Sequence, residues 1–436
     1  MRPFPTVRSE PHPELHAFIG HGLDIFRKPS LALEPVWQQG FRATLPYWEN
    51  RVNKRCHCID DLRQTMQARV SLQVADYFLG GAGQEITLKN NVEAFNRVAF
   101  NARFARRFDS VDMEVTILGQ KISMPVIAAP VGSLRTLFPV GEAVAASVIG
   151  KAGTICTLST LTGTRLEDVK EAAHGPCWFQ LYLVGGREVA VKAILRAKEA
   201  GYSALVLTID TPVAGHRMRD HYNGTPTLLH GTLLQKLPYA PQTLWHFNWL
   251  MGFYGDGGLM DFPNIQLKDG KPMVYADIGK QLENSAVTWA DVEWIREAWG
   301  HGPLIIKGVQ TIEDAKLAME YGAAAIVISN HGGRQLDRSP STLKMLAEIG
   351  PYVDRKQTRV LMDGGVRSGA DVLIARALGA DAVLIGRAYA YGLGAGGGVG
   401  VSRALELIRA DISHHMRLLG YQSINEVGRE CIHSLH

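Results

Sequence analysis

Eight short apolar runs, separated by stretches of helical periodicity, constrain the fold more than any other feature of the sequence. Each run is rich in β-branched residues and lacks polar alternation, which is typical of strands buried on both faces of a parallel sheet. The runs cover residues 125–130, 154–158, 177–182, 204–210, 303–307, 323–328, 359–363 and 382–386. Helical patterns follow several of them, at residues 141–152, 187–200, 311–321 and 368–378. Eight strands that alternate with helices predict an α/β fold, a closed TIM (β/α)8 barrel.

A helical extension precedes the barrel pattern. Residues 1–59 carry several prolines and aromatic side chains without a clear period, so we expect an N-terminal arm of short helices and irregular segments. Residues 60–74 repeat apolar side chains at helical spacing and lead to Tyr77 and to the helix-ending pair Gly80 and Gly81. A second helix is expected over residues 90–107, and a hairpin over residues 115–123. We expect this hairpin to plug one end of the barrel, within a domain that spans residues 60–436.

The spacing of the apolar runs is irregular at one point, where a long stretch separates the fourth run from the fifth. Its later part, residues 289–299, is amphipathic and is expected to form the barrel helix of that unit. Residues from about 219 to 287 are therefore expected to form an insertion after strand 4, at the carboxyl face of the barrel. The aromatic-rich segment 244–254 of the insertion is compatible with a lid, a subunit contact or a membrane-surface patch. The lack of flanking cations favours a lid or a subunit contact.

The charge and the apolar content narrow the class of partner. The formal net charge of +4 is small for 436 residues, and the basic residues are scattered, which argues against a nucleic acid and leaves an anionic small molecule open. No run of about 18 apolar residues is present, so no membrane-spanning helix is expected.

The five cysteines favour reduced thiols and a cytoplasmic location, because their number is odd and no secretory signal is visible. Cys56, His57 and Cys58 suggest a metal site, but no second pair at zinc spacing accompanies them. We therefore expect ordinary thiols and no metal, in a cytoplasmic protein for which a peripheral position at a membrane stays open.

Polar side chains collect where the predicted strands end. In a barrel all eight carboxyl ends face one side, so residues far apart in the sequence form one site. The residues at these ends are Pro130, Ser159, Gln180 with Tyr182, Thr208 with Asp210, Lys307, Ser329 with His331 and Arg334, Asp363, and Gly386 with Arg387. Scattered surface residues would rarely supply so many polar groups at strand ends.

The loops after the seventh and eighth strands have the composition of a phosphate site. Residues 363–369 and the pair Gly386 and Arg387 supply glycine amides, a helix N-terminus and guanidinium groups at the usual phosphate position of a barrel. Lys307 could stabilise negative charge that develops on a ring. Ser159, Gln180 and Thr208 offer neutral donors and acceptors that suit a flat heteroaromatic group. This combination favours a flavin mononucleotide (FMN) site over a sugar phosphate site.

The residues that carry these features resemble a known family, the FMN-dependent 2-hydroxy acid oxidases and dehydrogenases. The resemblance runs from about residue 60 to residue 426, and its most diagnostic motifs are residues 329–334 (SNHGGR) and 363–367 (DGGVR). Residues 179–182 and 207–212 match as well. The resemblance implies FMN as the cofactor, oxidation of an (S)-2-hydroxy acid to a 2-oxo acid, and a homo-oligomer, with tetramers common in the family. The oxidant stays open between oxygen, a quinone and a cytochrome.

The resemblance also implies a role for each matching residue. His331 would be the catalytic base, oriented by Asp210. Arg334 and Arg217 would bind the substrate carboxylate, and Tyr77 and Tyr182 would hydrogen-bond the substrate, Tyr182 within the catalytic group. Cofactor binding would involve Pro130, Val131, Gly132, Ser159, Gln180, Thr208, Lys307, Ser329, Asp363, Gly364, Gly365, Arg367, Gly386 and Arg387.

Two departures from the family pattern keep other functions open. Pro130-Val131-Gly132 replaces a common Pro-Thr-Ala, and Leu161 stands where an aromatic side chain is common, so a substrate bulkier than glycolate is expected. An alternative is a flavin-dependent maturase that oxidises a modified peptide or a biosynthetic intermediate. A third possibility, a flavin-binding scaffold without catalysis, is disfavoured by the presence of His331 and Arg334 together with Arg217 and Asp210.

Overall fold

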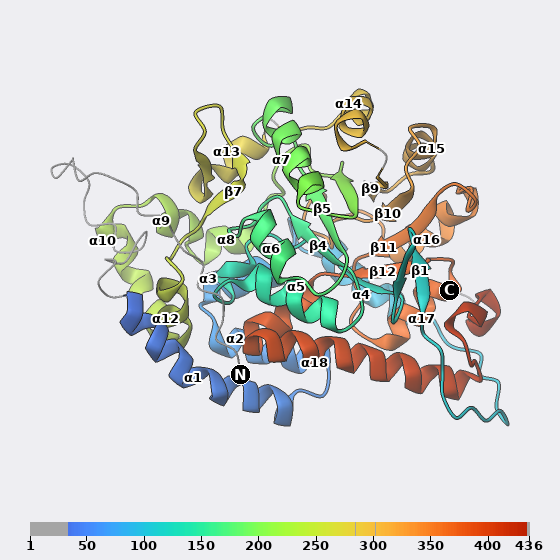
Figure 1. The fold of residues 1–436 in the computed structure, drawn as a ribbon. Coiled ribbons are helices and arrows are strands. Elements are labelled where there is room, and N and C mark those ends of the chain that lie inside the picture. The colour runs from blue at the N-terminus through green and yellow to red at the C-terminus, as the bar shows by residue number, and fades with distance from the viewer. Residues whose placement is uncertain (1–33, 284, 301, 434–436) are drawn as a thin grey trace.

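The computed structural model describes residues 34–283, 285–300 and 302–433, and eight parallel strands at its centre close into a barrel (Figure 1). The strands neighbour one another in the order β10-β11-β12-β3-β4-β5-β6-β9, which is the chain order of a (β/α)8 barrel. Their bounds are β3 Val126–Ala128, β4 Cys156–Ser159, β5 Cys177–Leu181, β6 Ala204–Thr208, β9 Leu304–Val309, β10 Ala325–Ile328, β11 Arg359–Asp363 and β12 Ala382–Ile385. Nearly all of their residues are buried, which confirms the eight strands predicted from the apolar runs.

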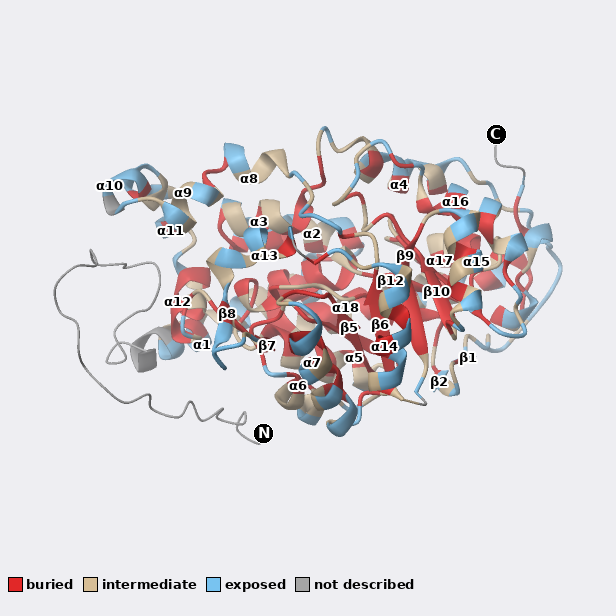
Figure 2. Ribbon diagram, turned by 90° about the horizontal axis from the view of Figure 1, so that it is seen from above, coloured by how far each residue is buried: buried red, intermediate tan, exposed pale blue. Residues whose placement is uncertain are grey.

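Eight helices follow the eight strands and cover the barrel. They are α5 Gly141–Lys151, α6 Leu166–Ala172, α7 Arg187–Glu199, α14 Trp289–Trp299, α15 Ile312–Glu320, α16 Thr342–Ile349, α17 Gly369–Ala377 and α18 Arg387–Leu419. Helices α7 and α14 show buried inner faces and exposed outer faces, as their amphipathic sequences require (Figure 2). Helix α18 is long and changes direction at Gly396 and Gly397, where the backbone leaves helical geometry.

From residue 34 onward, where the structure describes it, the N-terminal extension contains four helices, and its details differ from the expectation. The helices are α1 Glu34–Arg55, α2 Ile59–Arg69, α3 Leu72–Leu79 and α4 Ile86–Asn96. Residues 34–55 form one continuous helix instead of short irregular pieces, because α1 packs against α18 and against a helix of the insertion. The part of the predicted arm before residue 34 lies outside the described residues.

The helix predicted over residues 60–74 is two helices. Val70 is extended and ends α2, and Ser71 begins α3, although the apolar spacing continues across the break. The helix predicted over residues 90–107 starts earlier and ends at Asn96. The chain cannot continue as a helix there, since Phe100 pairs as an isolated bridge with Ile432 near the C-terminal end.

The predicted hairpin is confirmed as β1 Val115–Ile117 and β2 Gln120–Ile122. Its apolar residues Ile117 and Ile122 are buried, and Gln120 accepts a hydrogen bond from the Trp178 indole near the start of β5. The hairpin therefore lies at the amino ends of the barrel strands, away from the carboxyl face. Short 3-10 helices lie at Leu134–Thr136, Leu237–Tyr239, Tyr275–Asp277, Gly350–Tyr352, Ile424–Glu426 and Arg429–Cys431.

The insertion between β6 and β9 is mostly helical. Its elements are α8 Met218–Tyr222, α9 Thr225–His230, α10 Leu233–Lys236, α11 Ala240–Trp245, α12 Phe247–Gly255, β7 Asp261–Gln266, β8 Pro272–Val274 and α13 Ile278–Leu282. The aromatic-rich segment is divided between two environments. Trp249 and Tyr254 on α12 are buried in the main core, where α12 packs on α1, whereas Trp245 is 87% exposed. Helices α9 to α11 project from the barrel body (Figure 2).

Within the described residues, no helix combines the length and apolar character needed to cross a bilayer. The same part of the chain holds no group of three or more acidic, histidine or cysteine side chains suited to a metal ion. The Cys56 sulfur lies 3.5 Å from the Thr65 hydroxyl, and the amides of His57 and Cys58 donate to Asp61 at the start of α2. The Cys56-His57-Cys58 stretch is thus part of a helix start.

Candidate active site

His331 lies in the loop after β10, with both ring nitrogens held by side chains from other strands. Its Nδ1 atom is 2.9 Å from Oδ1 of Asp210, which follows β6. Its Nε2 atom is 3.3 Å from the hydroxyl of Tyr182, which follows β5. An ionised carboxylate can only accept a hydrogen bond, so Nδ1 of His331 carries the ring proton and donates it to Asp210 as a hydrogen bond. The Nε2 atom is left as an acceptor that faces Tyr182. The backbone at His331 is left-handed (φ 57°) and its amide donates to the Ser329 hydroxyl, so the ring is set by its loop.

The charges around His331 keep Asp210 ionised. Burial by itself would raise the pKa of Asp210, but the interactions with His331 and with Lys307 outweigh it and lower the pKa below its usual value. Lys307, at the end of β9, shows the complementary effect. Burial would lower its pKa, whereas Asp363 and Asp210 raise it. Asp210 and the buried ammonium of Lys307 therefore each favour the charged form of the other at the carboxyl face of the barrel.

A chain of hydrogen bonds joins the ends of β4, β5 and β6. The Ser159 hydroxyl donates to the Gln180 amide oxygen at 3.1 Å, and the Gln180 amide nitrogen donates to the Thr208 hydroxyl at 3.0 Å. All three side chains are buried. The sequence predicted these three residues at one site, and the structure brings them together in a row of fixed donors and acceptors.

A second row of polar contacts, a hydrogen bond and an ion pair, joins β9, β10 and β11. The ammonium of Lys307 donates to the Ser329 hydroxyl at 3.0 Å and lies 3.3 Å from Oδ2 of Asp363. The other oxygen of Asp363, Oδ1, is buried and has no partner among the described residues. A buried carboxylate oxygen without a partner is costly, so this atom is suited to accept a hydrogen bond from a bound group.

Two guanidinium groups converge on the ring of Tyr77, near the end of α3. The central carbon of Arg334 lies 4.8 Å from the ring centre, and that of Arg217 lies 5.0 Å from it. Burial and the nearby charge of Arg217 lower the pKa of Arg334. Asp220 pairs with Arg217 at 3.0 Å, whereas the polar contacts of Arg334 are the backbone carbonyls of Tyr77 and Gly80. Two like charges this close favour an anion between them, and a planar carboxylate fits two forks.

The predicted phosphate loops are present after β11 and β12. Gly364 and Gly365 have left-handed backbones, and a Cβ on Gly365 would come 2.1 Å from the carbonyl oxygen of Asn91. The N-terminus of α17 is already capped, because Asp411 accepts from the amides of Gly369 and Ala370. The N-terminus of α18 at Gly386 has no side-chain cap, so α18 offers the free amides.

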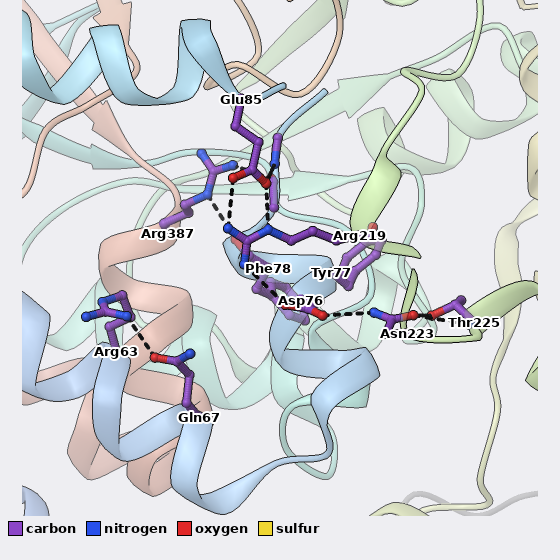
Figure 3. Close-up of polar contacts among 12 residues, drawn as sticks. Arg63, Gln67, Asp76, Tyr77, Phe78, Glu85, Arg219, Asn223, Thr225 and Arg387 are labelled. Carbon is purple, nitrogen blue, oxygen red and sulfur yellow. Dashed lines mark hydrogen bonds and ion pairs between the residues drawn. The ribbon is translucent and has the colours of Figure 1, made fainter. Parts of the chain in front are cut away.

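The two arginines predicted at this end are engaged with backbone carbonyls. Arg387 donates from all three of its nitrogens, to the carbonyls of Phe78, Gly332 and Gly80. Figure 3 shows Arg387 beside Phe78 at the end of α3. Burial lowers the pKa of Arg387 to about 9. One nitrogen of Arg367 donates to the carbonyl of Val366. A contact between Arg387 and a phosphate would thus come from its backbone amide at the start of α18.

The carboxyl face as a whole fits a flavin mononucleotide. The free N-terminus of α18 suits a phosphate, the unpartnered Oδ1 of Asp363 suits a hydroxyl of the ribityl chain, and Lys307 suits the electron-rich edge of the ring. The model for FMN-dependent dehydrogenases matches residues 66–434. This chain belongs to the family of FMN-dependent dehydrogenases.

Two curated relatives align with most of the length of this chain. The L-lactate dehydrogenase of Acinetobacter baumannii is 39% identical over 379 residues, which are 86% of this chain and 96% of that protein. The L-lactate dehydrogenase of Serratia proteamaculans is also 39% identical, over 378 residues that cover 85% of this chain and 97% of that protein.

Solved structures agree with this grouping. A crystal structure described as the monotopic membrane protein (S)-mandelate dehydrogenase superposes with a TM-score of 0.80 at 32% identity, covering 87% of this chain and 100% of that one. A mandelate oxidase structure superposes with a TM-score of 0.72 at 31% identity, covering 86% of this chain and 97% of that one. The dehydrogenase described here is therefore an FMN-dependent 2-hydroxy acid oxidoreductase on a TIM barrel, as the sequence motifs indicated.

Several residues around the site were not predicted. Asn91 on α4 exchanges two side-chain hydrogen bonds with Asn330, next to His331. Tyr275 of the insertion interacts with the Ser133 hydroxyl and lies near Tyr77 and Arg217. Neither residue follows a barrel strand, so a search for polar residues at the carboxyl ends of the predicted strands could not find them.

Proposed function

We propose that the enzyme oxidises an (S)-2-hydroxy acid to the corresponding 2-oxo acid, with His331 as the catalytic base. The observation that carries this proposal is the Asp210–His331 pair and its link to the two guanidinium groups at Tyr77. Tyr182 makes this link, because its hydroxyl lies 3.3 Å from Nε2 of His331 and interacts electrostatically with Tyr77 and Arg334. A 2-hydroxy acid needs both elements, a clamp for its carboxylate and a base a few ångströms away for its C–H or O–H proton.

Each side chain has a defined part in the reaction. Arg334 and Arg217 bind the substrate carboxylate, and Tyr77 and Tyr182 donate hydrogen bonds to the bound substrate. The Nε2 atom of His331 takes the proton, and ionised Asp210 stabilises the imidazolium that results. The bound FMN supplies the electron acceptor. Burial, followed by the negative charge of Asp210, raises the pKa of Tyr182, so its hydroxyl stays a proton donor.

The cofactor contacts are expected along the two rows of polar contacts. Ser159, Gln180 and Thr208 would contact a polar edge of the ring, and Lys307 with Ser329 would contact the edge on which negative charge develops. Pro130, Val131 and Gly132 would line the ring from the loop after β3. The phosphate and ribityl chain would be held by Asp363, Gly364, Gly365, Arg367, Gly386 and Arg387, the last through its amide.

The substrate is larger than glycolate in this proposal. The amide of Ser133 donates to the carbonyl of Leu161, so the two loops that depart from the family pattern touch each other. A Cβ on Gly132 would lie 2.9 Å from that same carbonyl, which leaves no room for a side chain here without a shift. The names of the relatives place L-lactate and (S)-mandelate among the acids to test.

The proposal is tested by anaerobic flavin bleaching with glycolate, L-lactate, (S)-mandelate and longer (S)-2-hydroxy acids. Bleaching by one of the acids larger than glycolate, with release of the 2-oxo acid, is expected. If none of these acids bleaches the flavin, the alternative of a maturase for a modified peptide or biosynthetic intermediate gains support. The corresponding (R)-acids are the matched control, because they present the α-hydrogen away from Nε2.

We also propose that the enzyme sits peripherally on a membrane and passes its electrons to a quinone or cytochrome there. The insertion exposes several large apolar side chains on α10, α11 and the segments beside them, and a structural relative is described as monotopic. The exposed side chains are Leu234, Leu237, Leu244, Trp245 and Phe247. Scattered apolar residues are common on surfaces, but five within one projecting segment favour a bilayer contact.

Flotation with phospholipid vesicles tests this contact. The wild-type enzyme should float, and a variant with Leu234→Asp and Trp245→Asp should stay in the dense fraction with unchanged flavin bleaching. Tyr352→Asp, which replaces another exposed aromatic far along the chain, is the matched control. A wild-type enzyme that does not bind vesicles and that reacts fastest with oxygen would contradict the proposed membrane contact and electron acceptor. Light scattering tests the homotetramer that the family resemblance suggests.

A further inference from the structure

We propose that Arg219 is a positioning residue, which holds the substrate-binding arginines in place by locking the carboxyl end of helix α3. The inference rests on the function proposed above, since it concerns the same carboxylate site. Arg219 lies in α8, at the start of the insertion, two residues after Arg217. It touches neither His331 nor the carboxylate clamp, so its effect has to be transmitted through α3.

Arg219 bridges two carboxylates that flank the end of α3 (Figure 3). Its Nε and Nη2 atoms donate to the two oxygens of Glu85 at 2.6 and 2.8 Å, a bidentate arrangement. Its Nη1 atom donates to Oδ1 of Asp76 at 3.2 Å. Asp76 lies within α3 and Glu85 lies beyond it, so one planar group spans both sides of the helix end.

The two carboxylates are themselves tied down on their far sides. Glu85 accepts a further hydrogen bond from the amide of Gly81, and Asp76 accepts one from the side-chain amide of Asn223 (Figure 3). Burial by itself would raise the pKa of Glu85, and the contact with Arg219 helps to lower it instead. The Glu85 and Asp76 side chains are only 15% and 14% exposed. Without Arg219, two carboxylates with little access to water would face each other and push the segment apart.

The end of α3 is also where the active-site arginines attach. The last carbonyls of a helix have no partner within the helix, and cations stabilise them. Here Arg334 donates to the carbonyls of Tyr77 and Gly80, and Arg387 donates to those of Phe78 and Gly80. Three loops of the barrel thus each send one arginine to the end of α3. Arg334 belongs to the carboxylate clamp and Arg387 to the cofactor end, whereas Arg219 belongs to neither.

Backbone contacts connect the same segment to both halves of the clamp. The amide of Gly83 donates to the carbonyl of His216, the neighbour of Arg217. The amide of Ala82 donates to the carbonyl of Gly333, the neighbour of Arg334. A displacement of residues 80–85 would therefore change the separation of the two guanidinium groups, and a shift of about 1 Å in such a clamp can cost on the order of 100-fold in rate.

A merely structural role for Arg219 predicts a different outcome from a positioning role. If Arg219 only stabilises the fold, its loss should lower the melting temperature and leave the kinetic constants of the folded enzyme unchanged. If it positions the clamp, the KM for the hydroxy acid should rise while FMN stays bound, because the carboxylate is held less well in the ground state as well as in the transition state.

The test compares four variants as purified holoenzymes: Arg219→Ala, Arg219→Lys, the double variant Arg219→Ala with Glu85→Gln, and Arg63→Ala. The double variant removes the charge that Arg219→Ala leaves unpaired, so it should recover most of the lost melting temperature. Arg63 is the matched control, since it donates to Asp60 and Gln67 on α2, away from the clamp (Figure 3). Readouts are kcat, KM, melting temperature, and the dissociation constant of oxalate from the oxidised enzyme, followed by flavin absorbance.

We expect KM and the oxalate dissociation constant to rise by about 10-fold or more in Arg219→Ala and in the double variant. Arg219→Lys should recover them only in part, because an ammonium cannot span two carboxylates with a fork, and Arg63→Ala should match the wild type. Unchanged KM and oxalate binding in the double variant would overturn the inference. A wild-type enzyme that oxidises no hydroxy acid would instead contradict the proposed function, so the two failures are distinguishable.

Discussion

The Nδ1 atom of His331 lies 2.9 Å from Oδ1 of Asp210, although the two residues belong to loops 121 positions apart in the chain. Strands β6 and β10 are separated in the barrel by β9 alone, so the closed sheet brings these loops together. The second carboxylate oxygen of Asp210 is buried and has no partner among the described residues. Asp210 is therefore held through Oδ1, which contacts His331 and the Thr211 hydroxyl. Any positive charge gained by His331 is stabilised directly by this carboxylate.

Replacement of His331 by glutamine is expected to leave a yellow protein whose turnover is reduced by a factor on the order of 10⁴ or more. Glutamine keeps a hydrogen-bonding group beside Asp210 but cannot take up a proton. Rapid-mixing measurement of anaerobic flavin reduction, with FMN content from absorbance, checks this. Full activity in the variant would remove the assignment of His331 as the base.

Replacement of Tyr182 by phenylalanine removes the hydroxyl 3.3 Å from Nε2 of His331. We expect turnover to fall by about 10- to 100-fold, since a single neutral hydrogen bond to substrate or base is lost. Melting temperature should change little, because the ring keeps its packing in the small cluster with Phe262 and Val184. Steady-state kinetics of the holoenzyme measure the effect, and a variant as fast as the wild type would exclude Tyr182 from the reaction.

Replacement of Lys307 by methionine should abolish or strongly weaken FMN binding. The ammonium compensates Asp363 and Asp210, and methionine would leave both buried carboxylates without this cation. Absorbance of the purified protein and titration with FMN report the loss. Lys344→Met, which removes an exposed lysine from α16, is the control. A Lys307→Met protein that is fully loaded with FMN would show that the lysine is not needed for the cofactor.

His415 predicts a pH dependence of stability. Its pKa is raised, chiefly because its side chain donates a hydrogen bond to Asp411. A group whose pKa is higher in the folded state contributes stability that is fully present below its unfolded pKa of about 6.5 and is lost as the pH rises through the folded value. The wild type should therefore lose stability above about pH 6.5. His415→Ala should be destabilised at pH 6 but match the wild type more closely at pH 9.

Denaturant unfolding at the two pH values measures this difference. Asp411 caps the N-terminus of α17 through the amides of Gly369 and Ala370, so the effect should be accompanied by weaker protection of those amides from hydrogen exchange. An equal loss of stability at pH 6 and pH 9 would mean that the charge of His415 contributes nothing.

The parts of the fold that the sequence predicted are those that local pattern determines. Strand β10 is a continuous apolar run that ends at Ser329, and a fully buried parallel strand can hardly look otherwise. The same holds for the other seven strands, so the barrel and the grouping of His331 with Asp210 and Lys307 followed. The search for polar residues at the carboxyl ends of the predicted strands also placed Ser159, Gln180 and Thr208 at one site.

The errors arose where a distant segment overrides the local pattern. The prolines of the N-terminal arm and the lack of a clear period suggested irregular structure, yet α1 continues through Pro46 and packs on α12 and α18. Val70 is buried although its backbone is extended, and it continues the apolar spacing of α2. The apolar pattern therefore gave no sign that α2 ends before Ser71.

The site residues that the sequence did not predict share a physical cause. Arg219, Asp76 and Glu85 act across segments that are separate in the chain, and an isolated arginine or acidic residue carries no sign of its partner. Arg217 and Arg219 lie two positions apart at the start of α8, a spacing that does not place side chains on one face of a helix, so the sequence gives no sign that both approach α3.

The division of the insertion has a practical consequence for how such enzymes can be altered. Helix α8 carries Arg219, and α12 packs on α1 in the main core, so both ends of this stretch are tied to the barrel body. Helices α9 to α11 between them project from it and carry the exposed side chains of Leu234, Leu237, Leu244 and Trp245 (Figure 2). Only these projecting helices can be exchanged for a polar segment while the contacts of α8 and α12 stay in place.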